Sequence, residues 1–168
     1  CSSLINFKGK WYLSFSDQWP DRQFHYRVSD SVNGEFIIPD EDTIDGNGFY
    51  AGRLETDGER LYAVGWNATN DMHLDSEEYN WGGNLGVHQL MQQTDGKLVP
   101  VLNEEVDKLM SNEIEVAVEK MTGTIETKEQ TYKFSGAPYE VLEYEPLIGS
   151  YILKTKIPDF KNREYLGF

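Results

Sequence analysis

Short alternating runs of hydrophobic and polar residues, separated by polar turns that contain glycine, dominate the first hundred residues. Residues 49–54 and 60–66 show the pattern most clearly, because they flank the polar stretch 55–59 and carry the large rings of Tyr50 and Trp66. Alternation with a period of two around an Asp-Gly turn predicts a β-hairpin. The other predicted pairs are 4–7 with 11–15, 24–28 with 35–38, and 85–91 with 97–102. The pattern therefore predicts an all-β fold, with no amphipathic helix in this part.

The second part of the chain has a different pattern. Residues 103–118, NEEVDKLMSNEIEVAV, are acidic and lack glycine, which indicates a connector or a short helix. Further strands are predicted after this stretch, with prolines at their margins, where a missing N–H is tolerated. They cover residues 131–134, 139–142, 151–157 and 164–168. Residues 119–168 are therefore predicted to start a second sheet system.

A loose repeat suggests the architecture of the first part. The tripeptide Thr-Asp-Gly occurs at residues 56–58 and again at 94–96, and Gly9, Gly58 and Gly96 are 49 and 38 residues apart. Sheet units that recur every ~40–50 residues are typical of propeller blades, and a closed propeller needs ~4–8 of them. The repeats in this chain account for about two to two and a half blades, which predicts a partial propeller.

Charge and composition exclude several classes of function. The formal net charge is −14, whereas a nucleic-acid partner or an anionic membrane surface requires a basic face. Cys1 is the single cysteine, so an internal disulfide and a Cys/His metal cluster are excluded. His25, His73 and His88 are scattered and are interpreted as surface or packing residues. We expect no metal, no cofactor, no nucleic acid and no membrane partner.

Several segments together resemble glycoside hydrolase family 32, the β-fructosidases that include invertases and levanases. Residues 1–5 with 11–16 look like the family segment that begins "EC" and continues into a "W-x-L-x-x-S" strand. Residues 45–51, DGNGFYA, are similar to its "DFYA" loop, although Gly48 stands where many members have aspartate, and that polar contact is lost. The remaining similar segments are 60–66 (R-x-x-x-x-GW), 81–85 with 95–98 (WGGNL, DGKL), and 151–153 with 164–168.

The resemblance implies a fold and an activity. The fold is a five-bladed β-propeller followed by a β-sandwich, so residues 1–102 would supply the C-terminal blades, 103–118 a connector and 119–168 the first sandwich strands. The activity is retaining hydrolysis of β-fructosidic bonds in sucrose, sucrose phosphate or fructan. The family's general acid/base, a glutamate, would stand just before Cys1, and its nucleophilic aspartate lies further upstream. The chain itself would therefore hold no catalytic residue and be inactive alone.

Four residues are candidates for the rim of the sugar site. Tyr50, Trp66 and Trp81 can pack against the C–H face of a sugar, which buries apolar area at low entropic cost. Asp45 can accept a hydrogen bond from a sugar hydroxyl. Packing within strands is the alternative role for the three rings, and turn formation before Gly46 is the alternative role for Asp45. The acidic residues 75–78 lack the spacing of a calcium loop and are interpreted as a solvated loop.

Other functions remain open from the sequence. A non-catalytic carbohydrate-binding β-protein would use the same rings without an acid pair. A lipoprotein would begin with a lipidated cysteine followed by serines, as at Cys1, and a glycosidase of family 43 or 68 would share a five-bladed propeller. A partial propeller exposes strand edges and half of its core. The chain is therefore expected to associate with the missing half of the propeller or with itself.

Overall fold

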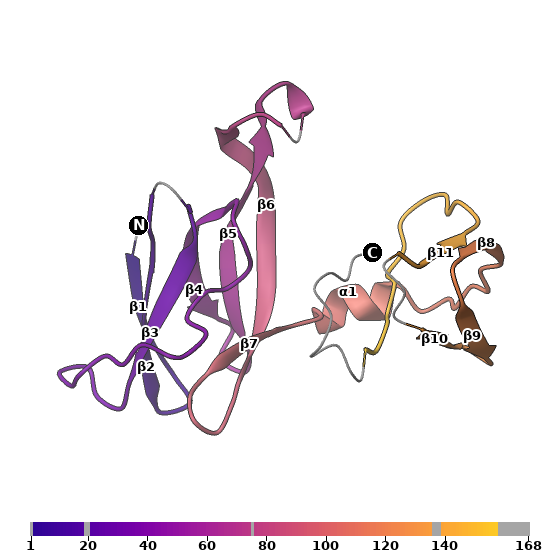
Figure 1. Ribbon diagram of the computed structural model, residues 1–168. Helices are drawn as coiled ribbons and strands as arrows, with labels where there is room; N and C mark the ends of the chain where they lie inside the picture. Colours follow the sequence, from indigo (N-terminus) through magenta and orange to yellow (C-terminus); the bar gives the residue numbers. More distant parts are fainter. Residues whose placement is uncertain (1, 19–20, 75, 136–138, 158–168) are drawn as a thin grey trace. The chain divides into compact units, whose positions relative to one another are not determined.

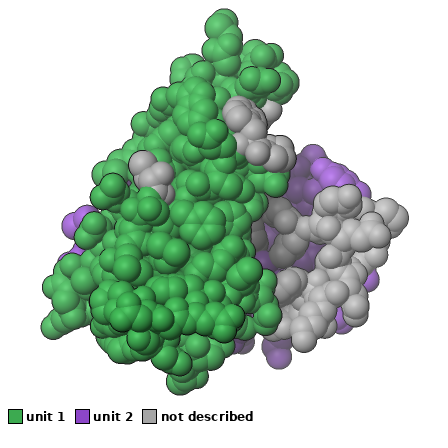
Figure 2. Space-filling view, turned by 90° about the vertical axis from the view of Figure 1, so that its left-hand side faces the viewer, with its two compact units in different colours: residues 1–104 green, residues 105–168 purple. Residues whose placement is uncertain are grey.

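The computed structural model describes residues 2–18, 21–74, 76–135 and 139–157 (Figure 1). The chain forms two compact units, Cys1–Glu104 and Glu105–Phe168, which are coloured separately in Figure 2. The strands of both units form antiparallel sheets, and among the described residues none of these sheets closes on itself. The prediction of an all-β chain is confirmed.

The first sheet of unit 1 has three strands in the order β1-β2-β3: β1 (Ser2–Phe7), β2 (Lys10–Ser16) and β3 (Phe24–Ser29). Lys8 and Gly9 connect β1 to β2 with φ values of 46° and 82°, as a two-residue hairpin turn requires. The predicted strand at 35–38 is wrong, because only Ile37 forms an isolated bridge, to Val28. Pro39 offers no N–H for a ladder, and the side chains of Ile37 and Ile38 are exposed.

The second sheet of unit 1 is a four-stranded antiparallel meander in the order β4-β5-β6-β7 (Figure 1). Its strands are β4 (Phe49–Thr56), β5 (Leu61–Asn70), β6 (Tyr79–Gln92) and β7 (Leu98–Val101). The two hairpins predicted in this region are confirmed. Strand β6 begins well before the predicted residue 85, and the 3-10 turn η1 (Asp71–His73) lies in the β5–β6 connection.

The hydrophobic core of unit 1 lies between the two sheets, with β4 packed against the first one. Phe24 of β3 and Phe49 of β4 meet edge to face, with ring centroids 5.7 Å apart. A Cβ atom on Gly52 would lie 2.9 Å from the Phe24 ring, so glycine allows the two sheets this close approach. The other fully or nearly fully buried apolar side chains are Phe7, Tyr12, Tyr26, Ile44, Leu54, Leu61, Ala63, Leu90 and Leu98.

Polar contacts tie the same two sheets together inside the core. Tyr12 of β2 donates its hydroxyl proton to Gly96 O at 2.8 Å and accepts a hydrogen bond from Gln92 Nε2 at 2.6 Å. The Tyr26 hydroxyl accepts a hydrogen bond from the backbone N–H of Leu98 at 3.0 Å. The two buried hydroxyls therefore have protein partners, which removes most of the cost of their burial.

Unit 2 contains nested hairpins. Strands β9 (Ile125–Lys128) and β10 (Thr131–Phe134) form the inner pair, and β8 (Val118–Thr122) and β11 (Val141–Tyr144) form the outer pair. Helix α1 (Glu104–Leu109) lies within the acidic stretch 103–118. None of the described side chains of unit 2 is fully buried.

The predicted strands of unit 2 match the structure unevenly. The strand predicted at 131–134 is β10, and the one predicted at 139–142 starts two residues later, as β11. Residues 151–157 contain no strand, and residues 164–168 lie outside the described residues. Strands β8 and β9 were not predicted, because an acidic, largely exposed sequence gives little alternation to detect.

Candidate functional site

Three of the four predicted rim residues come together at one end of the second sheet, beside the β5–β6 connection (upper part of Figure 1). Tyr50, at the start of β4, is the cross-strand partner of Trp66, near the end of β5. Its ring centroid lies 5.5 Å from that of Trp66 and 5.6 Å from that of Trp81 of β6, with interplanar angles of 77° and 75°. These edge-to-face contacts define an aromatic cluster of Tyr50, Trp66 and Trp81.

Exposure differs strongly across the aromatic cluster. Tyr50 is buried, at 8% relative exposure, whereas Trp81 is 63% exposed. Trp66 is intermediate between them. Core packing therefore accounts for Tyr50, while the Trp81 indole presents surface to solvent and is the ring best placed to receive a ligand.

A buried arginine, which the sequence analysis missed, holds the aromatic cluster together. The guanidinium Cζ of Arg22 lies 4.6 Å from the ring centroid of Trp81, 5.0 Å from that of Tyr50 and 5.4 Å from that of Trp66. Its exposure is 0%. A cation over aromatic faces is stabilised by their quadrupoles, most strongly when it is desolvated. Arg22 enters from the β2–β3 loop of the other sheet, so no spacing in the sequence reveals the contact.

Hydrogen bonds join the same guanidinium to the start of β6. Arg22 Nη1 donates to Tyr79 O at 3.1 Å and Nη2 donates to Asn80 O at 3.2 Å. The guanidinium also lies 5.9 Å from the ring centroid of Tyr79. Arg22 thus contacts the backbone immediately before Trp81 as well as the Trp81 ring.

The loop that carries Arg22 is closed by its own polar groups. Arg22 N donates to Gln18 O at 2.7 Å, and Gln23 N donates to Asp17 Oδ1 at 2.6 Å. Arg22 itself has a φ of 48°, in the left-handed region that few residues other than glycine adopt. Arg22 therefore has a strained backbone conformation.

His25 lies between two carboxylates next to this loop. Its Nε2 is 3.3 Å from Asp17 Oδ2 and its Nδ1 is 3.1 Å from Asp42 Oδ2. Arg27 pairs with the same Asp42 carboxylate, and the Phe15 ring stacks on the imidazole at a centroid distance of 5.5 Å. His25, which the sequence analysis interpreted as a surface or packing residue, thus belongs to a cluster of charged side chains and contacts Asp17 directly.

Asp45 has contacts of a different kind from those of the three rings. Its Oδ2 lies 2.8 Å from His88 Nε2, and its Oδ1 accepts the N–H of Gly46 at 2.7 Å. The contact with Gly46 agrees with the turn role considered for Asp45, whose φ is 66°. Both carboxylate oxygens thus already have protein partners. The ring centroid of His88, which the sequence analysis interpreted as a surface or packing residue, also lies 4.8 Å from that of Phe49.

The two glycines after Trp81, Gly82 and Gly83, have different surroundings. The structure places both within strand β6. A Cβ on Gly83 would lie 1.7 Å from the carbonyl oxygen of Asn67, whereas one on Gly82 would have no atom within 4 Å. The close approach is therefore between Gly83 and the neighbouring strand β5.

Some predictions concern residues that the structure does not describe. Cys1, which carries both the lipoprotein hypothesis and the position of the general acid/base, lies outside the described residues, as does Asp75 of the acidic loop. Residues 76–78 of that loop are exposed.

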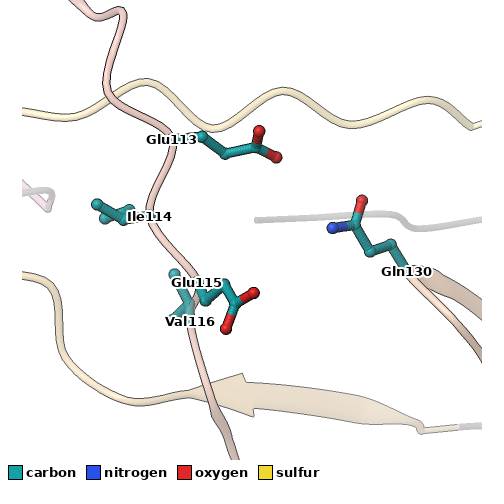
Figure 3. A pocket seen from close by; sticks show the side chains of 5 residues that line it. All are labelled: Glu113, Ile114, Glu115, Val116 and Gln130. Carbon is teal, nitrogen blue, oxygen red and sulfur yellow. The ribbon is translucent and has the colours of Figure 1, made fainter.

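A hollow in unit 2 has unsuitable chemistry for stacking a sugar. It measures about 600 Å³ and is lined by Glu113, Ile114, Glu115, Val116 and Gln130. Figure 3 shows the Glu113 and Glu115 side chains on the same segment and Gln130 across from them. It has no aromatic ring, so the aromatic cluster of unit 1 remains the best candidate site.

Two searches of the described residues for other sites were negative. Across 2–18, 21–74, 76–135 and 139–157, no group of three or more His, Cys, Asp or Glu side chains is arranged to hold a metal ion. In the same ranges, no helix has the length and hydrophobicity needed to cross a membrane.

The chain matches no model of a known protein family, and no curated protein is significantly similar to it in sequence.

Proposed function

We propose that this chain belongs to a retaining glycoside hydrolase of the family 32 type, which cleaves β-fructosidic bonds, and that the aromatic cluster lies at the rim of its sugar site. The observation that carries the proposal is the convergence of Tyr50, Trp66 and Trp81. The resemblance had selected these residues from separate segments, and they are 16 and 15 positions apart in the sequence.

The exposure of Trp81 supports a ligand role for the cluster. Arg22 lies against one side of the Trp81 indole, and the relative exposure of Trp81 is 63%. An exposed indole next to a buried tyrosine is a rigid platform, on which a furanose or pyranose ring packs its C–H face with little loss of entropy. The function of the cluster in this proposal is therefore substrate binding.

Catalysis in this proposal belongs to residues that the resemblance places outside the chain. Retaining glycosidases need two carboxyl groups about 5–5.5 Å apart, expected from the glutamate before Cys1 and from the upstream aspartate. Asp45 is a poor substitute, because His88 and the Gly46 N–H already occupy its oxygens. The chain then contributes affinity and orientation, and no cofactor is required.

The two sheets of unit 1 are proposed to be neighbouring blades of a five-bladed propeller. Each is an antiparallel meander, and the face of the second sheet that points away from the core carries exposed Leu85, Val87 and Met91. Leu85 is the cross-strand partner of Trp66, so this apolar face continues from the aromatic cluster. A further blade, or a second copy of the chain, would bury it. Unit 2 is proposed to begin the β-sandwich.

The test measures sugar binding and fructose release with matched variants. Binding of sucrose and of inulin-type oligosaccharides is measured by isothermal titration calorimetry, with malto-oligosaccharides as the negative ligand. Trp81→Ala should weaken fructoside binding about tenfold, the equivalent of one stacked ring. Tyr151→Ala is the control, since it removes an exposed ring from unit 2. Fructose release is assayed with the longest natural polypeptide that contains these residues.

The outcomes separate the possible functions. Binding that depends on Trp81, together with fructose release, supports the β-fructosidase. Binding that depends on Trp81 without release by that polypeptide supports the non-catalytic carbohydrate-binding protein. Absence of binding, or equal binding by the Trp81 and Tyr151 variants, rejects the aromatic cluster as a sugar site.

A further inference from the structure

Strand pairing leaves the position of Trp81 undetermined. Strands β5 and β6 are in register as far as Ala68 with Gly83, and they pair again only at Asn70 with Tyr79. Trp81 lies in the irregular interval between these pairs. Its backbone is therefore not fixed by the ladder that fixes the rest of β6, and another group has to define where the indole lies.

Arg22 provides the contacts that the ladder lacks. Its two terminal nitrogens bond successive carbonyl oxygens, those of Tyr79 and Asn80, directly before Trp81. The same guanidinium contacts the Trp81 ring at 4.6 Å, closer than its other ring contacts in the aromatic cluster. A planar guanidinium can make these two hydrogen bonds and the ring contact together, because its donors lie in its plane and its faces remain apolar.

We infer that Arg22 is the positioning residue of the aromatic site: it fixes the start of β6 and the Trp81 indole so that one side of the ring stays open for the sugar. This inference rests on the proposed sugar-binding function, and it deepens it. Arg22 is fully buried and does not touch the sugar. It acts on the ligand through Trp81.

Packing between the two sheets does not by itself require a buried guanidinium at Arg22. Apolar side chains of similar volume often replace buried charged groups without loss of stability. This chain instead places a non-glycine residue at a φ of 48° to insert the guanidinium. Asp17 closes the loop behind it, and His25 contacts Asp17 in turn. A buried guanidinium on a strained backbone indicates that the position of the neighbouring groups at the site has to be fixed.

The first experiment compares Arg22→Met with Arg22→Lys. Methionine keeps much of the apolar volume, and lysine keeps the charge but not the planar fork. Both variants should bind inulin-type oligosaccharides about tenfold more weakly, matching the loss in Trp81→Ala. Their midpoints of urea unfolding are measured in parallel, so that lost binding is assigned only to variants that remain folded.

A spectroscopic readout reports on the Trp81 ring itself. The protein is labelled with 5-fluorotryptophan, and the ¹⁹F resonance of Trp81 is assigned from its loss in Trp81→Phe. In Arg22→Met this resonance should shift or broaden, because the indole loses its cationic neighbour and its fixed backbone. The resonance of Trp11, on β2 in the first sheet, should stay in place. A purely structural defect would move both resonances.

Chemical rescue provides the decisive comparison. Arg22→Ala leaves space for a guanidinium ion. Millimolar guanidinium chloride should therefore restore fructoside binding and the Trp81 resonance of this variant, whereas sodium chloride at the same concentration should not. If Arg22→Met binds fructosides as the parent does while Trp81→Ala does not, the inference is wrong and the proposed function stands. If the parent binds no fructoside, the proposed function fails. The ¹⁹F spectrum then decides the positioning role, and an unchanged Trp81 resonance in Arg22→Met overturns it.

Discussion

Two adjacent glycines of β6 show how strongly one residue's surroundings decide its tolerance to change. A methyl group at Gly83 would overlap the carbonyl oxygen of Asn67, and one at Gly82 would meet no atom within 4 Å. Gly83→Ala should therefore lower the free energy of unfolding by about 1–3 kcal/mol, because β5 and β6 must separate. Gly82→Ala should change it by less than about 1 kcal/mol. Urea titration followed by tryptophan fluorescence measures both, and equal effects would contradict the close approach.

A second prediction at this scale concerns Tyr12. Burial raises the pKa of its hydroxyl to about 12, although the hydrogen bond from Gln92 acts in the opposite direction. In the unfolded chain the hydroxyl ionises near its ordinary pKa of about 10. Above that pH the unfolded state releases a proton that the folded state retains. The contribution of Tyr12 is therefore complete below pH 10 and is lost as the pH rises towards 12.

The measurement for Tyr12 is a comparison with Tyr12→Phe. At pH 8 the variant should be less stable by about 1–2 kcal/mol, because Gly96 O and Gln92 lose their partner. Between pH 10 and pH 11 the difference should narrow, since only the parent carries the ionisation penalty. A difference that stays constant from pH 8 to pH 11 would show that Tyr12 does not titrate as its burial requires.

At the scale of elements, the repeated Thr-Asp-Gly tripeptide makes two turns with unequal surroundings. Gly58, in the β4–β5 turn, has a φ of 101° with open space around it. Gly96, in the β6–β7 turn, has a φ of 90°, and an added Cβ would lie 3.2 Å from Val28 Cγ2. Identical tripeptides thus share a left-handed backbone conformation at glycine but differ in packing.

Alanine substitutions at the two turns should therefore lower the free energy of unfolding by different amounts. Gly58→Ala should cost about 1 kcal/mol, for the left-handed conformation alone. Gly96→Ala should cost about 1–2 kcal/mol more, because Val28 must move and the Gly96 carbonyl that receives the Tyr12 hydroxyl shifts with it. Thermal unfolding of the two variants side by side checks the order, and a larger loss for Gly58→Ala would reject it.

Asp57 stabilises the first of these turns through an Asx arrangement. Its Oδ1 accepts the N–H groups of Arg60 at 2.7 Å and Glu59 at 2.9 Å. These backbone hydrogen bonds, the one from Arg60 first, lower the pKa of Asp57. Its contribution is present above the ordinary pKa of an aspartate and is lost as the pH falls through the lowered value. The turn residues visible in the sequence thus act through the mechanism that their types predict.

Within unit 1, the strands predicted correctly are those with a buried face. β2 and β5 alternate between core and outer positions, so their period of two is visible in the sequence. β8 and β9 have no fully buried residue, and without a core to impose alternation the pattern is absent. At residues 35–38 a strand was predicted that the structure does not contain, because their hydrophobic side chains have no surface to pack against.

At the scale of the whole molecule, the uncovered face of the second sheet predicts association. Leu85, Val87 and Met91 are 74%, 44% and 51% exposed along one strand, and contiguous apolar surface of this kind is typical of interfaces. The chain alone should therefore form dimers or larger species in light scattering. The double variant Leu85→Glu/Val87→Glu should shift the chain towards the monomer, because it places negative charges on this face of every copy of the chain. Met72→Glu is the control, since Met72 is 76% exposed in η1 and lies outside the strands of the sheet.

A monodisperse monomer of the parent chain with a single cooperative melt would contradict this prediction. A decrease in association that is equal in the Leu85/Val87 variant and in Met72→Glu would assign the effect to net charge. The chain already carries a net charge of −14, so repulsion acts against association at every site. The measurement is therefore made at two salt concentrations.

The aromatic cluster illustrates which parts of a site can be predicted. Tyr50, Trp66 and Trp81 were selected because each is a large ring in a segment that resembles glycoside hydrolase family 32. Arg22 has no such signal, since it lies in the loop between β2 and β3 and the rings that it contacts belong to the other sheet. Asp45 was selected as a free hydrogen-bond acceptor, but His88, 43 positions away, is its partner. A residue's type and local pattern can be read along the chain, whereas its partners cannot.

The sequence by itself determined the all-β class, three of the four hairpins predicted in unit 1 and the chemistry of their turns. Each of these depends on interactions among residues a few positions apart, or on the two-residue period that one buried face imposes. The tertiary structure alone decided that Arg22 joins three rings from the other sheet, that Gly83 faces Asn67 and that one apolar face is left uncovered. These features depend on how two sheets pack, and the packing is fixed by the summed burial of the core rather than by any local pattern.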